Sequence, residues 1–229
     1  KYGVPLSLFN LNPKHEYGVF EIGMDKKGEI DYLSKILKPN VGIITNISYA
    51  HAKNFKNIKQ IAMAKSEIIN NIDTNGTMVL NADDNFFNIH KKIAIKKKLK
   101  VLTFSVNKKS NVRLQYIRKE KNKFKISIII NKKNKIFYVS SNFKNFINNL
   151  LATIAIVSIF KDPFKLISTL FKANISIKAR DKEARIIGIE SNIEKIAADS
   201  LFTFSSLAPV IVTPALLAPG IKANTWKIP

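Results

Sequence analysis

Apolar runs that alternate with amphipathic helices are the feature that most constrains how this chain folds. The runs cover residues 17–22, 41–46 and 77–80, and helical periodicity covers 28–37 and 57–70 between them. Buried parallel strands read as continuous apolar runs, and strand–helix–strand units join parallel neighbours through right-handed crossovers. The pattern predicts an α/β fold with a mostly parallel sheet and helices on both of its faces.

From about residue 99 the hydrophobic period changes to strand-like alternation. The segments with this pattern are 101–105, 112–117, 124–130 and 136–140. The last two pair plausibly as a hairpin across 131–134, with one face packed and the other solvated. We therefore expect a small antiparallel sheet, followed by an apolar helix over 142–157.

A lysine lies on the apolar face of the 57–70 helix. Lys65 shares this face with the isoleucines at positions 58, 61, 68 and 72. A lysine in such a stripe is costly unless it is paired, neutralised or chemically altered. It either reaches solvent at the edge of the stripe or points into an active site.

Two polar residues follow apolar runs nearby. Glu21 ends the first run, and His51 comes a few residues after the second. Ligands collect at the carboxyl ends of parallel strands, where a carboxylate and an imidazole can hold a divalent cation beside phosphate oxygens. The alternatives are that Glu21 caps the next helix and that His51 is a loop histidine without a role.

The chain carries a net charge of +22, which raises the possibility of a basic binding module for nucleic acid or other polyanions. Only four of its 38 basic residues are arginine, whereas phosphate-reading surfaces favour arginine interleaved with aromatics. The lysine cluster at 91–98 is therefore expected to be a solvated face. The sequence shows no membrane span or signal peptide, and its lack of cysteine fits a cytoplasmic protein.

Five motifs occur in a familiar order. They are Glu21-Ile-Gly-Met, Gly28-Glu-Ile, Thr45-Asn-Ile with Ala50-His51, Ala64-Lys65-Ser-Glu67-Ile, and Asn81-Ala-Asp-Asp84. Over roughly residues 1–160 this set resembles the central domain of the Mur ligases, in the branch that joins D-alanyl-D-alanine to UDP-N-acetylmuramoyl-tripeptide. The resemblance implies a P-loop NTPase-like sheet with a small antiparallel sheet appended. Another Mur ligase or a folylpolyglutamate synthase relative is the alternative.

The resemblance also implies the chemistry. Members of this branch form an amide in peptidoglycan synthesis with ATP and Mg²⁺, through an acyl phosphate, and the enzyme is expected to be a cytoplasmic monomer. Glu21 and His51 would bind Mg²⁺, together with Lys65 as a carbamate. Asn145 and Asn148 would lie near the adenine, although Asn145 fits a helix cap equally well. Asp83 and Asp84 are interpreted as a turn at the end of a strand.

One part of the family pattern is missing. The chain has 8 glycines, and none forms the Gly-rich loop that cradles phosphate in this family. We therefore expect residues 1–172 to be a partial ATP-binding domain that is inactive alone. Prolines at 209, 214 and 219 exclude a regular helix near the end of the chain. Residues 173–229 are interpreted as an irregular tail that is not the native continuation.

Overall fold

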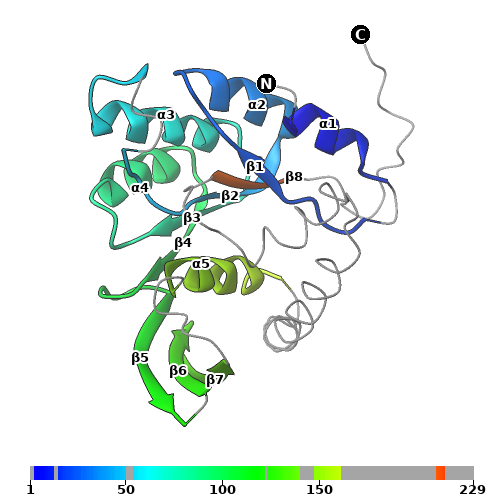
Figure 1. Cartoon of the computed structure of the whole chain (residues 1–229). Helices are drawn as coiled ribbons and strands as arrows, with labels where there is room; N and C mark the ends of the chain where they lie inside the picture. Colours follow the sequence, from blue (N-terminus) through cyan, green and yellow to red (C-terminus); the bar gives the residue numbers. More distant parts are fainter. Residues whose placement is uncertain are drawn as a thin grey trace, which may run out of the picture. The chain divides into compact units, whose positions relative to one another are not determined.

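The computed structural model of the chain describes residues 3–12, 15–49, 54–121, 123–139, 147–160 and 210–214. Their helices and strands are shown in Figure 1. In chain order they are α1 Gly3–Phe9, β1 Phe20–Ile22, α2 Glu29–Leu37, β2 Pro39–Ile44, α3 Ile58–Asn70, β3 Thr77–Asn81, α4 Phe87–Lys96, β4 Lys100–Ser105, β5 Val112–Glu120, β6 Lys123–Ile130, β7 Lys133–Val139, α5 Ile147–Val157 and β8 Val210–Pro214.

The chain divides into two compact units. The first takes in residues 1–80, 84–101 and 208–229, and the second takes in 81–83 and 102–207. The sheet of the first unit has the strand order β1-β8-β2-β3. β2 and β3 are parallel, and β8 is antiparallel to both β1 and β2, so β1, β2 and β3 all point the same way. The predicted α/β fold with parallel strands is confirmed.

The apolar stripes of α2 and α3 form much of the core of the first unit. Ile30, Leu33 and Leu37 of α2 are buried, as predicted, and Ile61 and Ile68 of α3 have no exposed surface. The two helices pack against each other, as Figure 1 shows. Burying a side chain of this size contributes about 1.5–3 kcal/mol, so packing rather than helix propensity stabilises these helices.

Local signals set where these two helices begin and end. Lys38 adopts a left-handed conformation with φ of 44°, which ends α2 directly before Pro39. Asn57 caps α3, because its side-chain oxygen accepts a hydrogen bond from the backbone N–H of Gln60 at 3.0 Å. The cap thereby fixes where α3 begins, and the helix contacts β2 of the sheet.

A tight turn before β3 requires glycine. The N–H of Gly76 donates to the carbonyl oxygen of Asp73 at 2.9 Å. A Cβ at Gly76 would lie 2.6 Å from the carbonyl oxygen of Asn40 and 2.8 Å from that of Asp73. These are backbone atoms that cannot move aside cheaply, so a larger residue cannot enter this turn without shifting the chain.

The second unit contains the antiparallel strands that the sequence predicts. β6 is antiparallel to both β5 and β7, while β4 and β5 are parallel. The hairpin differs from the prediction, because Ile130 pairs with Lys133 and leaves a turn of two residues rather than four. Asn131 and Lys132 both have positive φ, of 47° and 70°. Such a turn matches the twist of the strands that it joins.

The face of β6 that we expected to be solvated is partly covered. Ser127 has no exposed surface, and its hydroxyl is hydrogen-bonded to the side chains of Gln115 and Asn134, at 2.7 Å each. The cross-strand partners supply the polar contacts that water would otherwise make. At Ser127, the face of β6 that we expected to be solvated is therefore buried, and the serine hydroxyl is hydrogen-bonded within the protein.

The expectation of an irregular tail is wrong for the part that the structure describes. Val210–Pro214 forms β8, which lies between β1 and β2 and pairs with both. Prolines at 209 and 214 exclude a helix, but the four residues between them are β-branched and can pair as a short strand. The prolines therefore delimit a strand here instead of preventing one.

The lysine cluster of 91–98 is solvated, as predicted. It lies on α4 and directly after it, and its exposed lysines are Lys91, Lys92, Lys96, Lys97 and Lys98. Within the described part of the chain, no helix combines the length and the hydrophobicity that crossing a membrane requires.

Candidate functional site

Lys65 is buried on α3 and faces the end of β2. Only 8% of the surface of Lys65 is exposed. Its neighbours on the same helical face, Ile61 and Ile68, have no exposed surface. Its Nζ donates a hydrogen bond to the carbonyl oxygen of Asn46 at 3.3 Å, two residues after β2 ends. The side chain therefore does not extend into solvent along the edge of the stripe. It lies at the carboxyl end of a parallel strand, where ligands collect in such sheets.

Burial changes the chemistry of this amine. It lowers the pKa of Lys65 from 10.5 to about 8, while the carboxylates of Asp84 and Glu21 act in the opposite direction. Desolvation disfavours the charged form of an amine, and the two nearby negative charges only partly compensate. About a tenth or more of Lys65 is consequently neutral near pH 7, so the amine is nucleophilic at a pH where surface lysines are not.

Glu21 is the central residue of β1. Phe20 and Ile22 are buried on either side of it, and Glu21 projects from the opposite face. Partial loss of hydration raises the pKa of its carboxyl group, and the positive charge of Lys65 opposes this effect. A carboxylate that is short of hydration and close to a buried amine is suited to binding a cation.

Glu21 is not the residue that caps the following helix. The carboxylate of Glu67 accepts the backbone N–H of Gly28 at 2.9 and 3.0 Å and that of Asp31 at 3.2 Å. Glu67 lies on α3, 39 residues from Gly28, so it ties α3 to the start of α2. Helix N-termini favour such a carboxylate because their first N–H groups lack partners within the helix.

From the sequence we expected only a turn at Asp84, and we did not single out His90. Asp84 does form the expected turn, because its carboxylate accepts the N–H of Phe86 at 2.8 Å, but it also accepts the N–H of Ile47 at 2.8 Å. His90 is buried with 1% exposure, and its Nε2 lies 3.0 Å from the carbonyl oxygen of Ala62. Since a carbonyl only accepts, Nε2 carries the proton.

His90 belongs to the surroundings of Lys65. Burial lowers its pKa, so it is neutral at pH 7, with smaller influences from the charges of Asp84 and Lys65. The sequence does contain a signal for this residue: His90 lies one helical turn before the buried Ala94 on α4. A lone histidine at core spacing on a helix is in itself only weak evidence of function.

The described structure does not test the remaining predicted site residues. His51 and Asn145 lie outside the described residues. Asn148 is exposed on the first turn of α5, in the second unit. The described residues contain no cluster of three or more histidines, cysteines, aspartates or glutamates that could hold a metal. The predicted ligands include His51, outside the described residues, and a modified lysine, so the predicted set of ligands stays a prediction.

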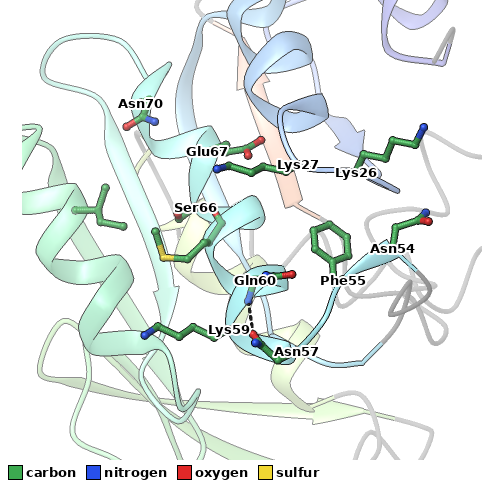
Figure 2. A pocket seen from close by; sticks show the side chains of 12 residues that line it. Lys26, Lys27, Asn54, Phe55, Asn57, Lys59, Gln60, Ser66, Glu67 and Asn70 are labelled. Carbon is green, nitrogen blue, oxygen red and sulfur yellow. Dashed lines mark hydrogen bonds between the residues drawn. The ribbon is translucent and has the colours of Figure 1, made fainter.

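A groove of about 840 Å³ runs along a different side of α3, as Figure 2 shows. From α3 it is lined by Lys59, Gln60, Met63, Ser66, Glu67 and Asn70. Lys65 is absent from this lining, because its position faces the core with the isoleucine stripe. The groove is therefore separate from the site around Lys65.

Comparisons with known proteins identify the family of this chain. A sequence model of the Mur ligase middle domain matches residues 1–157. The UDP-N-acetylmuramoyl-tripeptide–D-alanyl-D-alanine ligase of Rickettsia prowazekii is 32% identical over 196 residues, which are 83% of this chain and 42% of the relative. The enzyme of the same name from Buchnera aphidicola subsp. Acyrthosiphon pisum is 41% identical over 107 residues, 47% of this chain and 23% of the relative.

The alignment with the Rickettsia enzyme covers so much of the chain that it must extend past residue 172, where we expected the partial ATP-binding domain to end. The chain itself spans less than half the length of either relative.

Solved structures show the same fold. A crystal structure of MurF from Acinetobacter baumannii has a TM-score of 0.61 at 28% identity, covering 67% of this chain and 33% of that one. MurF from Thermotoga maritima, solved in complex with ADP, has a TM-score of 0.54 at 21% identity, covering 63% of this chain and 34% of that one. The second likeness concerns the fold alone.

Proposed function

Because the chain belongs to the Mur ligase family through its middle domain, we propose that it is part of the enzyme that adds D-alanyl-D-alanine to UDP-N-acetylmuramoyl-tripeptide in peptidoglycan synthesis. The observation that carries this proposal is the buried Lys65 at the end of β2, with the carboxylates of Glu21 and Asp84 acting on it. The names of the aligned relatives supply the substrates.

The proposed reaction forms an amide at the cost of ATP. The substrate carboxylate attacks the γ-phosphorus of ATP and ADP leaves, which gives an acyl phosphate. The amine of D-alanyl-D-alanine then attacks the acyl carbon, phosphate leaves and the amine releases a proton. Such steps depend on held geometry and on neutralised charge more than on a nucleophilic side chain.

Mg²⁺ would supply that neutralisation, held by Glu21, His51 and Lys65 as its carbamate. The residues present fit this role. A neutral amine can add CO₂ and lose a proton, and burial brings the pKa of Lys65 to about 8, where part of the amine is neutral. The carbamate would then be an anion close to Glu21 and Asp84. Three negative groups near one another favour the binding of a cation, and oxygen ligands suit Mg²⁺.

We further propose that residues 1–172 form the ATP-binding part of this enzyme, with Asn145 and Asn148 near the adenine. The 229 residues contain no Gly-rich phosphate loop, so this chain by itself is not expected to turn over ATP. A cytoplasmic location and a monomeric state fit an enzyme that uses ATP and a nucleotide-linked substrate.

A chimera tests the proposed activity. Residues 1–157 would replace the matching segment of the Acinetobacter baumannii enzyme, and the rest of that enzyme would remain in place. We expect phosphate release that requires both UDP-N-acetylmuramoyl-tripeptide and D-alanyl-D-alanine. Lys65→Met should abolish it, while Lys59→Met, on the exposed side of α3, should not. A folded chimera that releases no phosphate, or releases it without D-alanyl-D-alanine, would contradict the proposal.

A further inference from the structure

The two neighbouring aspartates after β3 have different partners. Asp83 binds the end of β4 and the loop after it, through the hydroxyl of Ser105 at 3.0 Å and the N–H groups of Val106 at 2.6 Å and Asn107 at 3.2 Å. Asp84 belongs to the first unit and binds the N–H of Ile47, in the loop after β2, at 2.8 Å. Only Asp84 therefore reaches the part of the chain that contacts Lys65.

The contact of Asp84 and the contact of Lys65 lie at opposite ends of one peptide group. The N–H that Asp84 binds and the carbonyl that accepts the amine of Lys65 both belong to the bond between Asn46 and Ile47. In a trans peptide these two groups point in opposite directions. Asp84 therefore lies at one edge of this planar peptide group and the amine at the opposite edge, in a continuous chain of hydrogen bonds.

This arrangement allows only one orientation of the peptide. If the peptide turned over, its N–H would face the amine of Lys65, which would place two donors together, and its carbonyl would face the carboxylate of Asp84. Both contacts would be repulsive, and linked hydrogen bonds in a buried site strengthen one another.

We propose that Asp84 is a positioning residue for Lys65: it holds the peptide between Asn46 and Ile47 so that the carbonyl faces the amine. The role of Asp84 goes beyond the function proposed above, and the part that concerns the carbamate rests on that function. A carbamate at Lys65 keeps one hydrogen on Nζ, so the bond to the Asn46 carbonyl survives the modification. That bond directs the carbamate N–H at the carbonyl of Asn46, and the two carbamate oxygens would then be available to bind a metal.

The matched variants Asp84→Asn and Asp83→Asn test this inference on the intact 229-residue chain. Each removes one negative charge at nearly constant shape, but only the first changes a side chain that binds Ile47 and whose charge acts on Lys65, so amide exchange at Ile47 is the readout specific to the positioning role. In Asp84→Asn we expect hydrogen exchange at the Ile47 amide to become about tenfold faster or more, as the loss of a hydrogen bond to a charged group implies. Reductive methylation of Lys65, measured by mass spectrometry relative to Lys59, should accelerate by a similar factor.

Asp83→Asn should leave both rates unchanged. If Asp84→Asn does not fold, as judged by circular dichroism, Asp84→Ser makes the same comparison, since serine can retain the turn at Phe86 but is too short to reach Ile47. Unchanged rates in the Asp84 variants, or equal changes in Asp83→Asn, would overturn the inference.

A third measurement separates this inference from the proposed function. ¹³C-bicarbonate is added and the carbamate carbon of Lys65 is followed by NMR, with Lys65→Met as the blank. No signal in the unmodified chain would count against carbamylation, and the exchange and methylation rates would still decide the role of Asp84. A signal that Asp84→Asn weakens, and Asp83→Asn does not, supports both.

Discussion

Replacing Lys65 with methionine measures how much the buried amine costs the fold. Methionine has a similar length and no charge, so it fills the same space between Ile61 and Ile68. Lowering the pKa of an amine from 10.5 to about 8 corresponds to about 3 kcal/mol against its charged form. The carbonyl of Asn46 loses its partner, which costs about 1 kcal/mol. We therefore expect Lys65→Met to raise the free energy of unfolding by about 2 kcal/mol near pH 7.

The gain should depend on pH with a definite sign. Above a pH of about 8 the folded protein has released the proton of Lys65, whereas the unfolded chain keeps it up to a pH of about 10.5. Between these values the unfolded state binds more protons, so the stability of the unmodified chain rises with pH. The advantage of Lys65→Met should therefore shrink over this range and reverse to about −1 kcal/mol at its upper end, where only the lost hydrogen bond remains.

The assay is urea unfolding followed by circular dichroism, at several pH values and in buffer free of CO₂, so that the amine stays unmodified. Lys59→Met is the control, because Lys59 is an exposed lysine of the same helix. The reasoning is refuted if Lys65→Met is less stable than the unmodified chain near pH 7. It is equally refuted if the difference in unfolding free energy between Lys65→Met and the unmodified chain is constant across the pH range, as is the difference between Lys59→Met and the unmodified chain.

Three further predictions concern the turn before β3, the cap of α3 and ATP. Gly76→Ala should destabilise the chain by about 1–3 kcal/mol in urea unfolding, because the new Cβ meets two backbone carbonyls; Gly23→Ala, with open space around it, should change stability by no more than about 0.5 kcal/mol. Asn57→Ala should cost about 1 kcal/mol by loss of the N-cap, and an unchanged denaturation midpoint would contradict that role. ATP with Mg²⁺ should give no phosphate release from the isolated chain, since its 229 residues lack a phosphate loop; measurable turnover would show that this loop is not needed.

Local periodicity was enough to predict most elements of the first unit. The stripe of Ile30, Leu33 and Leu37 and the apolar runs before and after it are repeated patterns within a few residues of each other, and the structure buries them as expected. The hairpin was placed correctly but its turn was not. Its length depends on Asn131 and Lys132 both taking positive φ, which neither residue type demands.

The sequence by itself determined that Lys65 lies on an apolar helical face and that the chain carries the ordered motifs of one family. Only the tertiary structure decided what surrounds that lysine. Asn46 is 19 residues away from it, and Asp84 binds Ile47 across 37 residues. The position of β8 likewise could not be read from the sequence, because β8 pairs with β1 and β2, which are far away in the chain. Spacing fixes which side of a helix or strand is buried, but contacts between distant segments depend on how all the elements pack together.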